Sequence, residues 1–274
     1  MKKSVLFILA LFLIGIMNMD AQVRIKKVGI ELGIDQDMIQ GLNGNGLLDK
    51  TNDDFRSRIS DSTLDNQFKY SGVCENPNIR LNVVLEPFFS PKVEIQTSLL
   101  VIWNRWDGMS YYNDNARDYS NVNVDLFGKE IGVEGALVRR LDVVKWLHLY
   151  GGGGVNTGVH FDNWLYATGY SQTSGEGTDL GRDLGETLFG TDEPENYWEQ
   201  FEDVEEDYFE DERKVSNGIS ARAFAQAGFG ISMWKKIEFG ATYRFGYGIR
   251  TFNNAPNDMT NLRSFSMHLR YVLN

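Results

Sequence analysis

Apolar and polar or small residues alternate strictly between positions 237 and 250. One set of positions holds Ile237, Phe239, Ala241, Tyr243, Phe245, Tyr247 and Ile249. The intervening set holds Glu238, Gly240, Thr242, Arg244, Gly246, Gly248 and Arg250. A period of two puts successive side chains on opposite faces of a strand, whereas a helix has a period of 3.6. The pattern therefore predicts a β-strand with one apolar and one polar face.

The same alternation recurs along the chain and predicts eight strands. The other seven segments are 26–35, 78–89, 92–106, 123–140, 147–161, 219–233 and 262–273. Short connections at 90–91, 141–146 and 234–236 alternate with four long ones. Such a pattern is typical of an up-and-down barrel. We expect an all-β fold, an eight-stranded antiparallel transmembrane β-barrel, with extracellular loops at 36–77, 107–122, 162–216 and 251–261.

Alternation does not say which face is wet, because a soluble lipocalin-like barrel has the same period. The expected polar face carries six acids and five bases, namely Glu31, Arg80, Glu86, Glu94, Glu130, Glu134, Arg222, Glu238, Arg244, Arg250 and Arg270. Nearly balanced charges indicate a closed lumen in which they pair. Aromatic residues also gather near the strand ends, as in membrane-interface girdles: Phe89, Trp146, Trp234 and Tyr271 on the turn side, Trp103, Trp106, Phe161, Trp164 and Phe252 on the loop side. A soluble periplasmic barrel is the alternative.

The first 21 residues have the organisation of a cleavable signal peptide. Lys2 and Lys3 precede an apolar run, and Ala21 offers a small residue at the cut. We expect a signal peptide at 1–21 and one outer-membrane barrel domain at 22–274, in a Gram-negative envelope. The one cysteine, Cys74, cannot form an internal disulfide and lies far from the expected cut, so we expect no lipid anchor.

The mature chain is acidic, with a net charge near −12 once Lys2, Lys3 and Asp20 are removed from a total of −11. Nucleic-acid binding needs an excess of Lys and Arg, so we expect no nucleic-acid partner. Outer-membrane lipid is the expected surrounding of the barrel. No spacing in the acidic loop 162–216 matches a calcium loop, and the three dispersed histidines do not form a zinc pair. Within 36–77, Asn43-Gly44-Asn45-Gly46 and Asn52-Asp53-Asp54 could suggest an ion site, but turn chemistry explains these residues more economically. We expect neither metal nor cofactor.

The chain resembles the small outer-membrane β-barrel families called OmpX-like and, more closely in loop layout, PorT-like. The resemblance rests on the alternation, on Asp20-Ala21-Gln22 at the expected cleavage point and on the terminal strand His268-Leu269-Arg270-Tyr271-Val272-Leu273-Asn274. It covers 22–274. The chain departs from these families by lacking a terminal aromatic residue, so assembly recognition would fall on Tyr271 and Leu273. A PorT-like resemblance implies an accessory of a secretion or envelope-assembly system.

The loop 162–216 is unusually acidic. Twelve carboxylates and no Lys or Arg lie between Asp192 and Glu212. Aromatic and apolar residues at helical spacing predict a short acidic amphipathic helix over the barrel mouth. Its aromatic side chains could pack on neighbouring loops, or could bind a protein partner. The partner-binding residues we expect are Tyr197, Trp198, Phe201, Tyr208 and Phe209.

The leading expectation is a non-enzymatic outer-membrane barrel whose long acidic and aromatic loops bind an envelope or extracellular protein. One alternative is the PorT-like accessory. Another is a lipid-modifying outer-membrane enzyme, for which His160 and Asp162 are the nearest candidates, although a Ser–His–acid site is defined by geometry that a sequence does not show. A pore is the least expected function, because eight strands leave an interior just wide enough for side chains.

Overall fold

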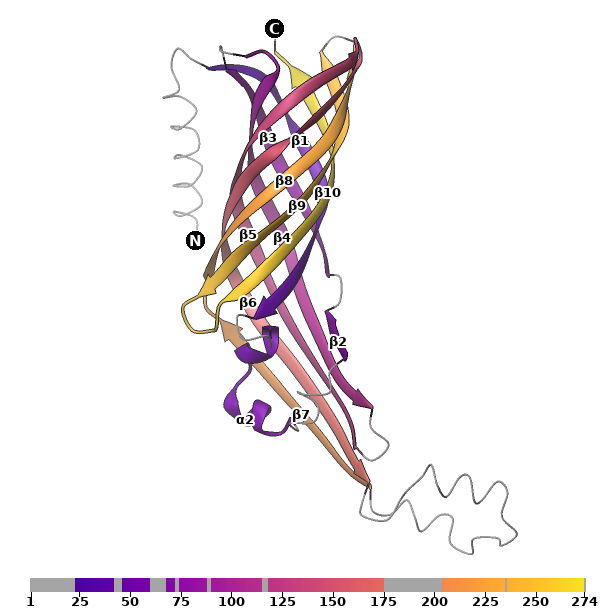
Figure 1. Ribbon diagram of the computed structural model, residues 1–274. Helices are drawn as coiled ribbons and strands as arrows, with labels where there is room; N and C mark the ends of the chain where they lie inside the picture. Colours follow the sequence, from indigo (N-terminus) through magenta and orange to yellow (C-terminus); the bar gives the residue numbers. More distant parts are fainter. Residues whose placement is uncertain are drawn as a thin grey trace, which may run out of the picture.

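Eight antiparallel strands close into a barrel in the computed structural model (Figure 1). The structure describes residues 23–41, 46–59, 68–71, 74–87, 90–114, 118–174, 204–234 and 236–273. The barrel strands, in order around the ring, are β1 (Val23–Gly41), β3 (Cys74–Pro87), β4 (Val93–Asp114), β5 (Asp118–Val144), β6 (Leu147–Ser174), β8 (Gly218–Met233), β9 (Ile237–Phe252) and β10 (Asp258–Val272).

The ring closes because the first strand pairs with the last. β1 lies between β3 and β10, with Glu31 opposite Arg80 on one side and opposite His268 on the other. The remaining neighbours follow chain order from β3 to β10, and every pairing is antiparallel. The prediction of an eight-stranded antiparallel barrel is therefore confirmed.

The barrel is apolar outside and charged inside. Leu32 and Leu269 are each 58% exposed on the outer wall, and Ile219 is 62% exposed. On the inner wall, Glu31 and Arg80 have no exposed surface. This distribution is the inverse of that in a soluble barrel and matches a wall that faces lipid, so the fold is a transmembrane β-barrel. No helix among the described residues is long and apolar enough to cross a membrane.

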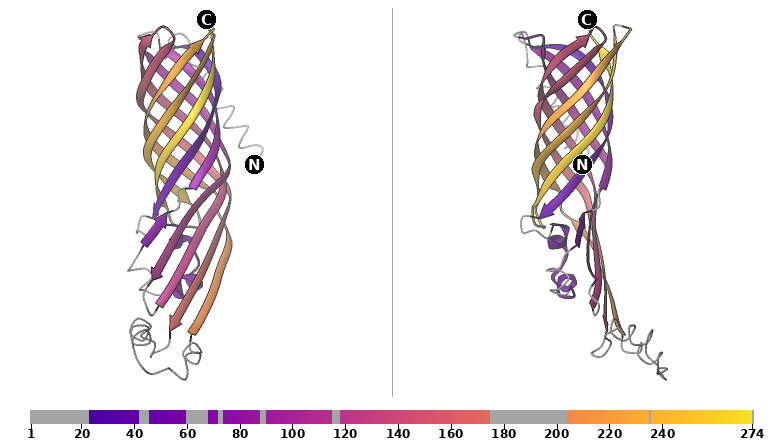
Figure 2. Two further views of the ribbon diagram at one scale, coloured as in Figure 1. Left: turned by 90° about the vertical axis from the view of Figure 1, so that its right-hand side faces the viewer. Right: turned by 45° about the vertical axis from the view of Figure 1, so that its right-hand side comes forward.

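Three barrel strands continue past the barrel on the long-loop side and, with β7, form a flat extension (Figure 2). This β-extension consists of the distal parts of β4 (106–114), β5 (118–127) and β6 (164–174), together with β7 (Val204–Val215). A short strand, β2 (Phe68–Ser71), pairs with the tip of β4. The prediction that 107–122 and 162–216 are loops is therefore wrong over 107–114, 118–122, 162–174 and 204–215.

The acidic helix predicted within 192–212 is also wrong where the structure describes this segment, because 204–215 is strand β7. β7 pairs with β6 along its whole length, from Asn163 opposite Val215 to Ser174 opposite Val204. Backbone pairing with a long neighbouring strand, and burial of Phe209, outweigh the local helical spacing of aromatic residues. The part of this prediction that falls on 192–203 lies outside the described residues.

The two remaining expected loops also contain regular structure. Within 36–77, β1 runs on to Gly41, a 3-10 helix η1 (Gly46–Lys50) and a short helix α2 (Asp53–Ser57) follow, and β3 begins at Cys74. Within 251–261, β9 extends to Phe252 and β10 begins at Asp258.

Irregularities in neighbouring strands coincide at the junction between barrel and extension. The register of β4 on β5 shifts between Ile102 and Arg105, and that of β5 on β6 shifts between Phe127 and Lys129. Asp162 in β6 adopts a positive φ of 57° beside the second shift. Bulges bend strands and are frequent at barrel rims. Here they let the strands leave the curved wall.

The fold predicts the behaviour of the mature protein in detergent. Far-UV circular dichroism should give a β spectrum, and the folded protein should migrate differently on gels before and after boiling, because the closed hydrogen-bonded ring resists detergent. A mainly helical spectrum, or a monomeric protein that stays in solution without detergent, would contradict the barrel.

Candidate functional site: the charged lumen and the loop-side extension

The turn-side end of the lumen is organised around Glu238. Lys27 Nζ lies 2.7 Å from this carboxylate, Arg270 Nη1 lies 3.3 Å away, and His148 Nε2 lies at 3.1 Å. Lys27 also lies 3.3 Å from Glu94. A register shift between Ile25 and Lys27 interrupts the pairing of β1 with β3, and the side chain of Lys27 is buried.

Two ion-pair clusters fill the middle of the lumen. Arg244 Nη1 donates to Glu31 Oε1 at 2.5 Å and to the Ser266 hydroxyl at 2.9 Å. Arg80 joins three strands, since it donates to Asp35 at 2.9 Å and to Glu134 at 2.8 Å. Each guanidinium therefore ties together strands that are distant in sequence.

The loop-side end holds a continuous chain of charges. Glu130 accepts from Arg222 at 3.0 Å and from Arg105, and Arg105 in turn donates to Asp107 at 3.0 Å. Arg250 links Asp107, at 2.7 Å, to Asp258, at 3.0 Å. All of these side chains are buried.

Counted over the described residues, the buried charges of the barrel and its mouth balance. The eight carboxylates are Glu31, Asp35, Glu94, Asp107, Glu130, Glu134, Glu238 and Asp258, and the eight cations are Lys27, Lys50, Arg80, Arg105, Arg222, Arg244, Arg250 and Arg270. Buried charges are tolerated when they are paired and hydrogen-bonded. A neutral, filled lumen follows.

Ten of the eleven charged residues that the sequence assigned to the lumen are buried there. The eleventh, Glu86, lies at the turn-side rim with its side chain 24% exposed, 2.5 Å from Lys26. Sequence reasoning missed Lys27, Lys50, Asp35, Arg105, Asp107 and Asp258. Lys27 and Asp35 lie on the same period-two face as Glu31, so the alternation along this strand would have identified them. The bulge after Ile102 interrupts the alternation of β4, so Arg105 and Asp107 fall out of its period. Asp258 lay in a segment expected to be a loop.

The histidines lie in the lumen and form no catalytic pair with Asp162. His160 is buried, with Nε2 3.8 Å from Glu130. Asp162 instead lies 2.5 Å from Lys129, at a partly exposed position. Among the described residues, no group of three or more His, Cys, Asp or Glu side chains could hold a metal ion.

η1 closes the loop-side mouth of the barrel through Lys50. The ammonium group lies 2.9 Å from Asp258, donates to the carbonyl of Pro256 and sits 4.8 Å from the ring centre of Phe252. Burial lowers the pKa of Lys50 from its ordinary value, and the Asp258 carboxylate opposes that shift. Phe252, expected in the outer aromatic girdle, is instead buried here, and the guanidinium carbon of Arg250 lies 5.2 Å from the centre of its ring.

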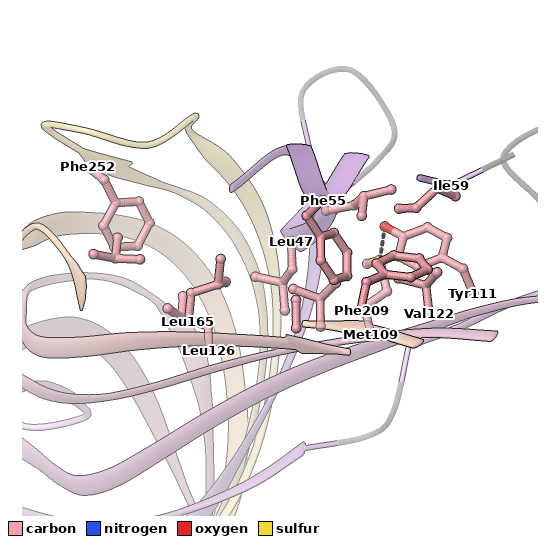
Figure 3. Close-up of a cluster of buried hydrophobic side chains, with 14 residues drawn as sticks. Leu47, Phe55, Ile59, Met109, Tyr111, Val122, Leu126, Leu165, Phe209 and Phe252 are labelled. Carbon is pink, nitrogen blue, oxygen red and sulfur yellow. Dashed lines mark hydrogen bonds between the residues drawn. The ribbon is translucent and has the colours of Figure 1, made fainter. Parts of the chain in front are cut away.

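A separate hydrophobic core lies between the β-extension and the segment 46–59 (Figure 3). Phe55 of α2 meets Phe209 of β7 edge-to-face, with ring centres 4.9 Å apart. A Cβ atom at Gly169 would lie 2.2 Å from the Phe209 ring, so glycine is needed where that ring crosses β6. The other buried members are Leu47, Leu48, Ile59, Met109, Tyr111, Val122, Val124, Leu126, Leu165, Ala167, Val215 and Phe252.

Polar contacts fix the same segment to β7. The Asn52 side chain caps α2 by accepting from Phe55 N–H at 2.6 Å, and the Asn52 N–H donates to Asp211 Oδ2 at 2.9 Å. Burial, with the Asp49 carboxylate, raises the pKa of the Tyr111 phenol in this core. The extension is therefore a two-layer unit, sheet on helix, with its own core.

The opposite face of the β-extension is open and aromatic. Trp106, Trp164, Tyr166 and Tyr208 are all exposed there, and Tyr208 is 63% exposed. Lys214 lies 5.8 Å from the centre of the Trp164 ring.

The structure describes two of the five expected partner-binding residues, and these two lie on opposite faces of β7. Tyr208 lies on the open face of β7, whereas Phe209 points to the opposite side and is buried against Phe55. Tyr197, Trp198 and Phe201 lie outside the described residues.

Comparison with known proteins gave matches among solved structures. No family model matches the chain, and no curated protein matches it. The solved structures include the attachment invasion locus protein Ail of Yersinia pestis (8% identity, TM-score 0.29, covering 91% of this chain and 100% of that one). Neisserial surface protein A matches with 8% identity and a TM-score of 0.36, covering 91% and 99%. The outer membrane protein OprG from Pseudomonas aeruginosa matches with 10% identity and a TM-score of 0.40, covering 93% and 97%. The OmpX-like and PorT-like resemblance stays a prediction.

Arg244→Ala should destabilise the barrel by on the order of 3–5 kcal/mol, because Glu31 would stay buried without its closest cation. Water entry would reduce the loss. The measurement is the urea midpoint for unfolding from lipid vesicles, followed by heat-modifiable migration. Arg139→Ala removes an exposed arginine from the outer wall and is the matched control. Equal midpoints for the two variants would show that the lumen pair does not stabilise the wall.

Lys50→Ala should loosen the mouth while leaving the barrel intact, since it removes the contacts of η1 with Asp258 and Phe252. Amide hydrogen exchange in 46–59 should accelerate on the order of tenfold, as expected for local opening. Exchange in β8 and β9 should stay unchanged. Lys92→Ala, at an exposed turn on the opposite end, is the control. Unaltered exchange in 46–59 would rule out Lys50 as the anchor.

Proposed function

We propose that this chain is a non-enzymatic barrel of the Gram-negative outer membrane that presents its β-extension to a protein partner outside the cell. The observation that supports the proposal most strongly is the separate core of the extension. Fourteen buried residues from η1, α2, Ile59 just after α2 and five strands hold its layers together. A recognition surface on such a scaffold loses little conformational entropy on binding.

The filled lumen favours recognition over transport. Its ion pairs run from Glu238 at the turn side to Asp258 at the mouth, and Lys50 closes that mouth. Binding therefore falls to the surface beyond the barrel. The signal peptide expected at 1–21 would supply the export route, with cleavage near Ala21.

The open face of the extension supplies features typical of binding surfaces. Aromatic side chains are common anchors at protein interfaces, and exposed Tyr208 stands beside Glu206, Glu210 and Glu212. A negative field around an aromatic anchor favours a partner with a basic surface. Trp198 and Phe201, which the sequence also assigns to partner binding, would extend this surface.

Tyr208→Ala should weaken partner binding by about tenfold or more, as expected for an interface anchor. The measurement is affinity purification from native membranes in mild detergent, with quantification of each retained protein. Trp234→Ala removes an exposed aromatic residue at the opposite end and should have no effect. Binding should also weaken as salt rises through about 0.15 M. If both variants retain the same proteins equally at all salt concentrations, the extension is not the recognition surface.

A further inference from the structure

One edge of strand β7 is unpaired among the described residues. β7 pairs with β6 along 204–215, and no described strand pairs with its other edge. The next strand around the ring does not reach it, since β9 ends at Phe252 and the chain turns back into β10 at Asp258. β7 forms one side of the extension (Figure 2), and along its outer edge the backbone N–H and C=O groups have no strand partner among the described residues. Such an edge is a template for an added strand.

The opposite edge of the extension is covered. β2 pairs with β4 there, from Phe68 opposite Tyr112 to Ser71 opposite Met109. Closer to the barrel, the side chain of Asn76 accepts a hydrogen bond from the Trp106 N–H at 2.7 Å. The two edges of one sheet thus differ, and in the part of the chain that the structure describes the β7 edge is the one without a strand partner.

Charge on β7 selects the kind of strand that fits. Glu206, Glu210 and Glu212 are exposed on the open face of β7, which they share with Tyr208 and one cation, Lys214, at a period of two. Opposite charges on directly facing residues of neighbouring strands stabilise a pair, and like charges destabilise it. A second copy of this chain would bring carboxylates against carboxylates. A strand with Lys or Arg at the positions that face Glu206, Glu210 and Glu212 would place each of these cations beside a glutamate.

The inner face of β7 sets a second requirement. Phe209 packs against Phe55, and Asp211 accepts from Asn52 N–H, so α2 already occupies this side. Arg58 of the same segment lies 3.7 Å from Asp207. An added strand would therefore need small or β-branched uncharged residues at the positions that face α2.

We propose that the free edge of β7 binds an extended segment of a basic partner protein by strand addition, with Lys or Arg alternating with small or β-branched residues. The inference rests on the proposed function and specifies the chemistry of its partner. Backbone hydrogen bonds supply the affinity, and the glutamates on the open face supply the selectivity and register.

The test uses the mature protein in lipid nanodiscs and fluorescent ten-residue peptides in which Lys alternates with Thr or Val. Fluorescence anisotropy should show binding of the Lys peptide and no binding of its Glu counterpart. Two further peptides carry N-methyl groups on one or the other alternate set of backbone amides. Methylating the set that faces β7 should weaken binding about tenfold or more, since several hydrogen bonds are lost, whereas methylating the other set should leave it nearly unchanged.

A matched pair of variants localises the site. Glu210→Lys should weaken Lys-peptide binding about tenfold at low salt, because an attractive pair becomes repulsive. Asp142→Lys makes the same change of charge at an exposed position on the turn side and should bind as the wild type does. Heat-modifiable migration checks that both variants fold.

The outcomes separate this inference from the proposed function. Equal binding of the two N-methylated peptides would show attraction without strand addition and overturn the inference. Failure of every Lys peptide, while Tyr208-dependent partner binding persists, would overturn the inference and leave the function standing. If the protein dimerises, the peptide does not compete with the dimer, and Glu210→Lys abolishes dimerisation, then the edge binds a second copy of this chain. That result would overturn the inference. Absence of both peptide and partner binding would overturn both.

Discussion

Charge pairing inside the barrel is the constraint on which the rest of the structure depends. An inner wall that carries eight buried carboxylates would repel itself without the eight cations that face them. Desolvation of so many charges is costly, so the pairs must have good geometry to be tolerated. Arg80 of β3 binds Asp35 of β1 and Glu134 of β5, so the pairing also fixes strands to one another. The same contacts fill the space that a channel would need.

The extension depends on a change in what covers the sheet. Within the barrel, the inward carboxylates of β4 and β5, such as Glu94, Glu130 and Glu134, pair with cations of other strands. Beyond the bulges near Ile102 and Phe127 there is no opposite wall, and the inward positions become apolar, as at Val122, Val124 and Leu165. η1 and α2 cover these residues. The bulges therefore mark the boundary between an electrostatically filled barrel and a hydrophobic two-layer unit.

The sequence predicted the barrel well because its signal is local. Alternation in 237–250 needs no knowledge of the neighbouring strands, and all eight barrel strands were found in this way. The extension was missed since its open face carries loop-like residues, such as Asn121, Asn123 and Asp125 in β5, and acids in β7. Its apolar face is covered by 46–59, a segment that ends 59 positions before β5 begins. The helical spacing in the acidic segment was a real local pattern that pairing with β6 overrode. In the candidate site, Tyr208 and Phe209 were found as residues, but their separation onto opposite faces follows from the strand.

The barrel and the extension are joined by one continuous set of contacts. Glu130 is linked through Arg105, Asp107 and Arg250 to Asp258, and Lys50 binds Asp258 from η1. From Lys50 the chain leads directly to Asn52, whose backbone is held by Asp211 of β7. Apart from the covalent link from Lys50 to Asn52, each step is a hydrogen-bonded or ionic contact. Together with the pairing of β7 on β6, these contacts fix β7 relative to the barrel interior. The free edge of β7 is therefore presented in a fixed orientation relative to the barrel, which is the condition under which a strand edge can select its partner by register.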